Sequence, residues 1–254
     1  MAIEQERGRR GRAKPRRRVS VVGILGELFI TAGVLVLMFL GWQVWLGNLI
    51  DGNTQKNESV ALSQTWNKGQ APAPVVSNER PDPGPPVVGT APEEDVQFGN
   101  MIIPRFGADY IRPIREGIDV EDVLNLGVGH YPGSAMPGAV GNAAFAAHRT
   151  GHGSPFFDIE KIQVGDHIFI ETEAGWYQYS MRSLEYVQPT GVGVLAPVPQ
   201  APGVEPKDRI LTLTSCNPVF TASERIILYS TYDTWYPRAG GAPAEIAAVA
   251  GAAS

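Results

Sequence analysis

Cysteine is almost absent from this sequence, because Cys216 is the only one among 254 residues. The chain therefore cannot close an intrachain disulfide. A lone cysteine on an apolar strand is usually a small buried hydrophobe. In a domain outside the cytoplasm, however, a leftover thiol is a candidate reactive group. The function of the chain therefore depends on what surrounds Cys216.

Basic residues are scarce beyond the first 18 positions. Eight of the 21 Lys and Arg residues lie in residues 1–18, together with only two acidic residues. Beyond position 50 the chain has 13 basic and 23 acidic residues. Because nucleic acid is bound through clustered positive charge, we expect no nucleic-acid partner for the main part of the chain.

The sequence contains only one long apolar run. In residues 28–46 only Thr31 and Gln43 are clearly polar, and this length is close to the ~20 apolar residues that a bilayer core requires. We predict a single transmembrane segment over residues 19–50. The positive-inside rule leaves the basic arm of residues 1–18 in the cytoplasm and the rest of the chain outside the cell membrane. A cleaved signal peptide is the alternative, but the run is long for one and no Ala-x-Ala spacing follows it.

Three further segments differ in composition. Residues 51–97 are rich in Asn, Ser, Gln, Pro and Glu, which predicts a Pro-rich extracellular linker without a core of its own. Residues 98–238 are long enough to build one hydrophobic core. Residues 239–254 form an Ala/Gly tail, to which we assign no structure and which is too weakly apolar for a second membrane span.

Short strands dominate the predicted domain. They cover residues 100–105, 142–148, 167–171, 175–187, 210–216 and 225–232. Turn residues separate them at short intervals, which is typical of an all-β barrel or sandwich. Two short helices are predicted at residues 118–124 and 154–161, the second because Ser154-Pro155 is typical of a helix start.

Cys216 lies at the end of a predicted strand, because Asn217-Pro218 directly after it interrupts the β-branched pattern. Arg225 begins the next strand, and antiparallel pairing would bring it back towards Cys216. A guanidinium beside a thiol can favour the thiolate or hold the oxyanion that forms when a thiolate attacks a carbonyl.

Histidine offers a second candidate, His148, which also ends a predicted strand. His148, His152 and Cys216 could be imagined as a three-ligand zinc site. Gly151 and Gly153 argue against the helix that would place both imidazoles on one face, and an arginine beside the thiol would oppose a cation. We therefore expect no metal and no cofactor.

The strand Thr-Leu-Thr-Ser-Cys216, followed by Arg225 on the next strand, resembles the active-site strand of the sortases, cysteine transpeptidases of Gram-positive cell surfaces. Residues 129–149 resemble the sortase stretch that leads into the catalytic histidine. Two positions depart from the usual pattern: Ser215 replaces a threonine and Ala147 replaces a glycine. Neither departure removes a catalytic group.

The resemblance implies a mainly β fold, an eight-stranded sortase-like β-barrel with short helices, preceded by one N-terminal transmembrane helix. Residues 98–238 are then the catalytic domain. It also implies that Cys216 attacks a Leu-x-x-Thr-Gly sorting signal between Thr and Gly, that His148 acts as the acid and base, and that Arg225 holds the oxyanion. The partners implied are surface proteins with a C-terminal sorting signal and a peptidoglycan precursor amine of the lipid II type. His130 and His167 fall at positions without a catalytic role.

The basic arm, the single span and residues 148–156 look most like class E, the housekeeping sortases of actinobacteria. This class implies a preference for Leu-Ala-x-Thr-Gly, and Tyr110 is a candidate for recognising the second position, although a core role is as compatible with its sequence context. Thr214 and Ser215 are further candidates for substrate binding. Three alternatives stay open: a cysteine peptidase that uses water, a pilin-polymerising sortase, and a membrane-tethered binding protein without turnover.

Overall fold

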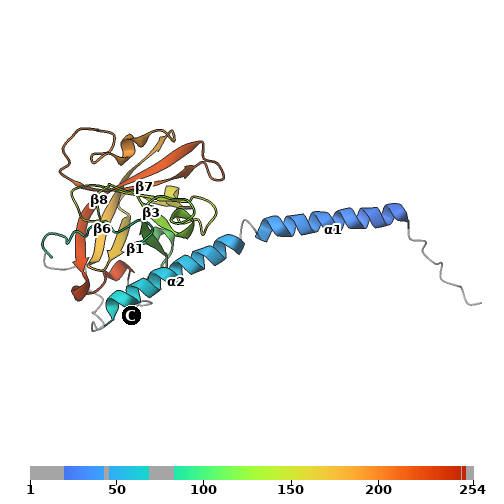
Figure 1. The fold of residues 1–254 in the computed structure, drawn as a ribbon, viewed down its shortest axis with the longest axis horizontal. Coiled ribbons are helices and arrows are strands. Elements are labelled where there is room, and N and C mark those ends of the chain that lie inside the picture. The colour runs from blue at the N-terminus through green and yellow to red at the C-terminus, as the bar shows by residue number, and fades with distance from the viewer. Residues whose placement is uncertain (1–19, 43–45, 69–82, 247, 250–254) are drawn as a thin grey trace, which may run out of the picture. The chain divides into compact units, whose positions relative to one another are not determined.

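The computed structural model describes residues 20–42, 46–68, 83–246 and 248–249. The chain divides into two units, Met1–Trp42 and Gln43–Ser254. The first unit contains helix α1 (Val21–Gly41), none of whose residues is buried (Figure 1). In the described residues, α1 is the one helix long and apolar enough to cross a bilayer, which agrees with the predicted membrane anchor.

The second unit contains a closed barrel with the strand order β1-β2-β3-β4-β7-β8-β6-β5, so eight strands are seen in the described part of the chain (Figure 1). Their bounds are β1 (Gln97–Ile102), β2 (Ile111–Glu116), β3 (Val128–His130), β4 (Gly141–Ala147), β5 (His167–Thr172), β6 (Gly175–Val187), β7 (Arg209–Asn217) and β8 (Glu224–Pro237). Neighbouring strands are antiparallel except β2 with β3 and β4 with β7. The predicted eight-stranded barrel is confirmed.

Local predictions were less accurate than the fold class. Strands β2 and β3 were not predicted, because β2 carries Arg112, Pro113 and Arg115, and β3 is only three residues long. The helices predicted at residues 118–124 and 154–161 are wrong, since turns and short 3₁₀ segments occupy these places. Segments of seven or eight residues are too short to offset the cost of starting an α-helix without tertiary packing.

The predicted linker also needs correction. Helix α2 (Gly47–Asn67) lies against the barrel (Figure 1) and buries Gln55, Ser59 and Ser63, which are four residues apart and so share one helix face. The sequence predicts a tether here because residues 51–97 are too polar to form an apolar core. The barrel surface beneath α2 is polar as well, so polar side chains of the helix are buried against it. Of the linker, residues 69–82 lie outside the described residues.

The remainder of the linker is attached to the barrel too. The indole Nε1 of Trp235 donates to the Gly84 carbonyl at 3.0 Å, and the Tyr177 hydroxyl donates to the Val87 carbonyl. Both bonds lead from the described linker residues to long strands of the barrel. The described part of this linker is therefore packed against the barrel rather than extended away from it.

The Ala/Gly tail, left without structure by the sequence, also packs on the barrel. Ala242, Ile246 and Val249 are buried in a small cluster with barrel residues that include Phe169 and Trp176. Apolar side chains here are few but spaced so that one side of the tail is apolar. Their burial removes apolar surface from water and holds the described tail residues in place.

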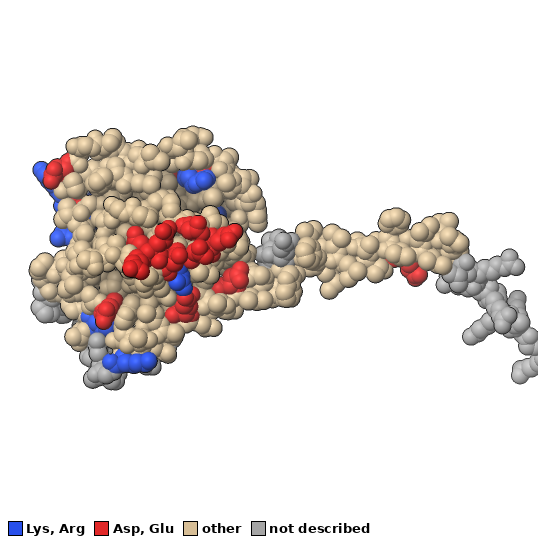
Figure 2. Space-filling model, viewed as in Figure 1, with Lys and Arg blue, Asp and Glu red and all other residues tan. Residues whose placement is uncertain are grey.

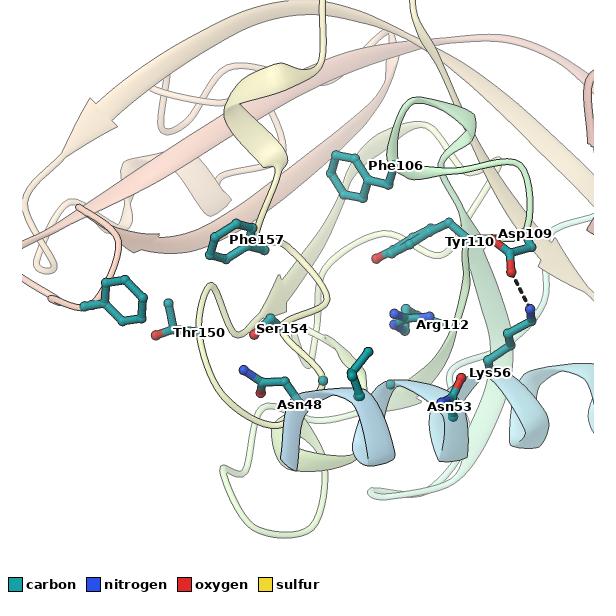
Figure 3. A pocket seen from close by; sticks show the side chains of 14 residues that line it. Asn48, Asn53, Lys56, Phe106, Asp109, Tyr110, Arg112, Thr150, Ser154 and Phe157 are labelled. Carbon is teal, nitrogen blue, oxygen red and sulfur yellow. Dashed lines mark hydrogen bonds and ion pairs between the residues drawn. The ribbon is translucent and has the colours of Figure 1, made fainter. Parts of the chain in front are cut away.

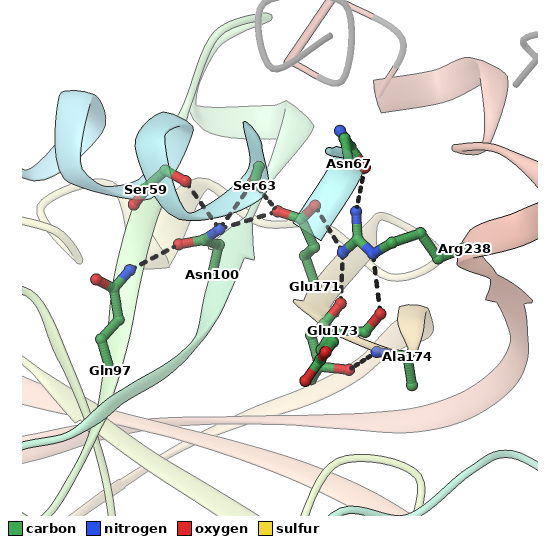
Figure 4. A network of polar contacts seen from close by, with 10 residues as sticks. Ser59, Ser63, Asn67, Gln97, Asn100, Glu171, Glu173, Ala174 and Arg238 are labelled. Atoms are coloured by element: carbon green, nitrogen blue, oxygen red, sulfur yellow. Dashed lines mark hydrogen bonds and ion pairs between the residues drawn. The ribbon is translucent and has the colours of Figure 1, made fainter. Parts of the chain in front are cut away.

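A buried polar network joins α2, the barrel and the segment after β8 (Figure 4). Asn100 on β1 donates to Ser63 Oγ at 3.0 Å and to Glu171 Oε2 at 2.9 Å. The other oxygen of Glu171 accepts from Arg238 at 3.0 Å, and both side chains of this ion pair are almost completely buried. The Arg238 guanidinium also lies over the rings of Trp66 and Trp176, at 5.1 and 4.6 Å from their centroids. Because these charges are paired and hydrogen-bonded, the network can hold α2 against the barrel.

Candidate active site

The thiol and the predicted guanidinium meet across one pair of strands. Antiparallel pairing of β7 with β8 sets Cys216 directly opposite Arg225, as the sequence pattern predicts. Cys216 is a free thiol and is partly exposed. Arg225 Nη1 donates to the carbonyls of Ala222 and Glu224, at 3.0 and 3.1 Å. Its Nε and Nη2 have no partner among the described residues, so these donors are available to an incoming oxyanion.

The histidine reaches the same end of the barrel through the parallel pair of β4 with β7. The last registered pair is Ala146 with Thr214. Two residues further along each strand are His148 and Cys216, which places both residues where these neighbouring strands end. The Ser215 hydroxyl donates to the Ala147 carbonyl at 2.8 Å and so keeps the two strand ends together. The fold therefore gathers Cys216, His148 and Arg225 at one barrel end, on three adjacent strands.

His148 has a polar partner that the sequence did not suggest. Its Nε2 lies 3.0 Å from Oδ1 of Asn125, an oxygen that can only accept, so Nε2 carries the proton. In the described part of the chain Nδ1 has no hydrogen-bonding partner. Burial lowers the pKa of His148 below its ordinary value, and the nearby His152 lowers it further. The centroids of the His148 and His152 rings are 5.1 Å apart. In the resting state the imidazole is thus held through Nε2, and Nδ1 is free for proton transfer.

Helix α2 braces the segments on both sides of this imidazole. Gln55 is almost completely buried, and its Nε2 donates to the carbonyl of His152 at 2.9 Å and of Asn125 at 3.4 Å. Sequence reasoning missed both Gln55 and Asn125. A single amide in a polar segment has no periodicity or spacing that indicates such a role, so only the folded arrangement reveals it.

Arg149, next to His148, was also missed. It is 1% exposed and donates to the Asn217 side chain at 2.5 Å, to the Cys216 carbonyl at 3.5 Å, and to Glu160 in an ion pair of 2.6 Å. The guanidinium therefore connects the loop after His148 to the end of β7. The one available signal was a charged residue placed directly after a predicted buried strand.

The two hydroxyl residues before the thiol are buried. Thr214 Oγ1 donates to the Phe145 carbonyl at 3.2 Å and lies 3.0 Å from the Tyr131 hydroxyl. The Ser215 hydroxyl is used by the Ala147 carbonyl. Both hydroxyls therefore join β7 to its neighbours in this structure, and their role in substrate binding stays a prediction.

Tyr110 lies in the wall of a pocket of about 540 Å³ (Figure 3). Its hydroxyl donates to the Pro155 carbonyl at 2.6 Å, and burial raises its pKa, so the phenol is neutral. The walls come from α2, from the start of β2, and from the loops that follow His148 and Cys216. The lining residues are Asn48, Leu49, Gly52, Asn53, Lys56, Phe106, Asp109, Tyr110, Arg112, Thr150, Gly153, Ser154, Phe157 and Phe220. A substrate role for Tyr110 is compatible with this position and stays a prediction.

The two remaining histidines hydrogen-bond to carboxylates away from the thiol. His130 is completely buried beside Glu116, with Nδ1 2.7 Å from the carboxylate. His167 lies 2.6 Å from Glu245 of the tail. Within the described ranges, no three His, Cys, Asp or Glu side chains are grouped as metal ligands would be.

Acidic side chains gather on the barrel face beside α2, as Figure 2 shows. Residues 93–95 and 119–122 each contain exposed acidic residues. The two segments are close: Gly117 lies two residues before Asp119, and a Cβ placed on it would be 3.1 Å from Cγ of Glu94. The surface next to the Asn125 loop is therefore negative, which favours the approach of cationic rather than anionic macromolecules.

Comparison with known proteins identifies relatives of this chain. The Sortase domain family matches residues 101–233. Sortase E1 of Streptomyces coelicolor is 36% identical over 249 residues, which are 95% of this chain and 65% of that protein. The chain thus spans about two thirds of the length of this relative.

Solved structures give the same result. The SrtA sortase from Actinomyces oris has a TM-score of 0.61 and 32% identity, covering 65% of this chain and 94% of that one. The crystal structure of sortase E1 from Streptomyces coelicolor with a tripeptide in the active site has a TM-score of 0.56 and 38% identity, covering 62% and 99%. Both structural alignments cover nearly the whole of the compared chain.

Proposed function

The chain belongs to the sortase family and resembles its class E members, and on that premise we propose that it is a membrane-anchored cysteine transpeptidase. It cleaves a Leu-x-x-Thr-Gly sorting signal, with Leu-Ala-x-Thr-Gly preferred, between Thr and Gly. It then joins the surface protein to an amine of a peptidoglycan precursor. The observation that carries the proposal is the strand register, with Cys216 opposite Arg225 and the end of β4 beside the end of β7.

In the first step the Cys216 thiolate attacks the threonine carbonyl carbon and forms a C–S bond. The carbonyl oxygen becomes an oxyanion, to which the unused Nε and Nη2 donors of Arg225 hydrogen-bond. The intermediate collapses by breaking the C–N bond. The His148 imidazolium gives its proton to the departing glycine amine, which leaves a thioester and a neutral imidazole.

In the second step the acceptor amine attacks the thioester carbonyl. Neutral His148 takes the proton that the amine loses, and Cys216 leaves as a thiolate, so both groups return to their starting states. The hydrogen bond from Nε2 to Asn125 keeps the ring orientation constant through the cycle. Water can replace the amine in this step, and the reaction is then hydrolysis.

Helix α1 anchors the enzyme in the cell membrane with the basic arm in the cytoplasm and the barrel outside. The proposal is supported by the length and composition of α1 and by the eight basic residues before it. Protease added to intact, wall-stripped cells is expected to digest the barrel and spare the arm. Digestion of the arm instead would reverse the topology.

The activity is tested with the full chain in detergent micelles and peptides containing Leu-Ala-x-Thr-Gly or Leu-Pro-x-Thr-Gly, with and without an amine. We expect cleavage in both cases and a transfer product only with the amine, with the alanine peptide used faster. The Cys216→Ala variant should form neither product. Hydrolysis alone in the presence of amine would indicate a peptidase, and binding without cleavage would indicate an inert binding protein.

A further inference from the structure

The pocket beside Tyr110 contains a guanidinium that forms no ion pair in the part of the chain that the structure describes. Arg112 points from β2 into the space between the Tyr110 ring and α2 (Figure 3), with its Cζ 4.6 Å from the ring centroid. Its Nη1 donates to the Ile111 carbonyl at 2.8 Å. Its Nε is buried without a hydrogen-bonding partner, and no carboxylate of the described residues lies within ion-pairing distance of it.

The charged side chains of the pocket carry one net positive charge. Of the lining residues only Lys56, Asp109 and Arg112 are charged. Lys56 and Asp109 pair with each other at 2.5 Å, and this contact holds the pKa of Asp109 below its usual range. One positive charge therefore remains. Gly52 of α2 keeps the space beside it open, because even a Cβ there would approach Arg112 Nη2 to 3.4 Å.

The pocket adjoins both catalytic loops. Thr150 follows His148 by two residues, and Phe220 belongs to the loop between β7, which contains Cys216, and β8, which contains Arg225. A molecule bound in the pocket would thus lie beside the segment that directly follows His148, whose imidazole transfers the proton. In the proposed reaction the group that must meet this imidazole in the second step is the acceptor amine.

We infer that this pocket is the acceptor subsite and that Arg112 selects acceptors bearing a free carboxylate near the attacking amine. The inference rests on the proposed function, and it assigns Tyr110 to the acceptor in place of the predicted contact with the second position of the sorting signal. A planar guanidinium fork binds a carboxylate through two parallel hydrogen bonds, and a single net positive charge matches a single carboxylate. Phe106, Phe157 and Phe220 add apolar surface to the pocket, and Arg112 Nε is itself buried from water, which strengthens a charge contact there. Arg112 acts as a specificity-determining residue and takes no part in bond making.

The test uses matched acceptors with the full chain in detergent micelles. Glycine, diglycine and triglycine are each compared with their C-terminal amides, and the ratio of kcat/KM for acid over amide is measured. The same ratio is then measured for the Arg112→Gln variant. Dividing the two ratios cancels the intrinsic difference in amine basicity between acid and amide. A hydrogen-bonded charge pair predicts a quotient of roughly tenfold or more for at least one acceptor.

Two further variants serve as controls. Arg115→Gln is the same substitution on the same strand, at a side chain that pairs with Glu58 of α2 outside the pocket, and it should keep the wild-type ratio. Arg112→Lys should keep part of the preference, and it replaces Arg112→Gln if that variant does not fold. A quotient of one, or an equal loss of the ratio in Arg115→Gln, would overturn the inference.

A separate measurement distinguishes failure of the inference from failure of the proposed function. Mass spectrometry of the enzyme with signal peptide alone reports whether the Cys216 thioester forms, and its absence would reject the proposed function. Binding of triglycine and triglycine amide to the Cys216→Ala variant by calorimetry needs no turnover. Preferential binding of the acid that Arg112→Gln removes supports the subsite, and equal binding of acid and amide rejects it.

Discussion

Two polar clusters of this molecule are built on opposite principles. Around Glu171 and Arg238, at the docking face of α2, each charge is buried and has several partners. Around Cys216, at the end of β7, donors of Arg225 and one nitrogen of His148 have no partner in the described residues. Satisfied networks stabilise a fold, whereas unsatisfied groups beside a reactive side chain are available to substrate. The cluster at Glu171 therefore has the features of a structural contact, and the donors left unpaired near Cys216 support the reaction proposed there.

The variant Arg225→Lys changes the cluster around Cys216, and we expect it to have the largest effect of the variants described below. A lysine provides a point charge in place of the planar fork, so the oxyanion loses paired donors. We expect kcat/KM for the signal peptide to fall by about 10²- to 10³-fold while the melting temperature changes little. Wild-type rates in this variant would mean that Arg225 is only a surface charge on β8.

Breaking the other cluster should affect stability. Glu171→Ala leaves the Arg238 charge buried without its carboxylate, which typically costs about 3–5 kcal/mol in the free energy of unfolding. Urea unfolding of the full chain in micelles measures the loss. The control is Lys161→Ala, which removes an exposed pair with Asp158 and should cost at most about 1 kcal/mol. Equal costs for the two variants would show that the buried network is no more stabilising than a surface contact.

A smaller effect is expected at Asn125. Its side chain hydrogen-bonds to His148, and among the described residues it has no hydrogen bond to the Cys216 thiol. Asn125→Ala removes the acceptor that orients the imidazole, and we expect kcat to fall about tenfold with KM nearly unchanged. Asn125→Gln moves the amide and should not restore the rate. A change in KM alone would assign Asn125 to substrate binding.

The smallest effect concerns the pH dependence of activity. Burial and then His152 hold the pKa of His148 below its ordinary value, so removing the His152 charge should raise that pKa. The acid limb of the kcat/KM profile should then move to higher pH in His152→Asn, while burial keeps the pKa low. Asparagine tolerates the left-handed backbone of this position, where φ is 49°. His167→Asn, whose partner is Glu245 of the tail, is the control, and an equal shift there would disprove the assignment.

The site could be predicted only in part. Cys216 was singled out as the only cysteine, and the connection after it allows the antiparallel pairing that sets Arg225 opposite it. His148 was found by resemblance, and its place beside Cys216 depends on the parallel pairing of β4 with β7. Asn125, Gln55 and Arg149 were missed, since each gains its contacts from a segment far along the chain.

By itself the sequence determined what depends on neighbours along the chain: the apolar span, most strands of the barrel, and the strand end that presents Cys216. The tertiary structure alone decided the place of α2, the packing of the tail, and the pocket around Arg112. The reason is physical. An apolar pattern has the same consequence in any fold, because water excludes it everywhere. A polar side chain such as Gln55 is buried only where the fold provides a partner, so its role is decided after the strands have been assembled.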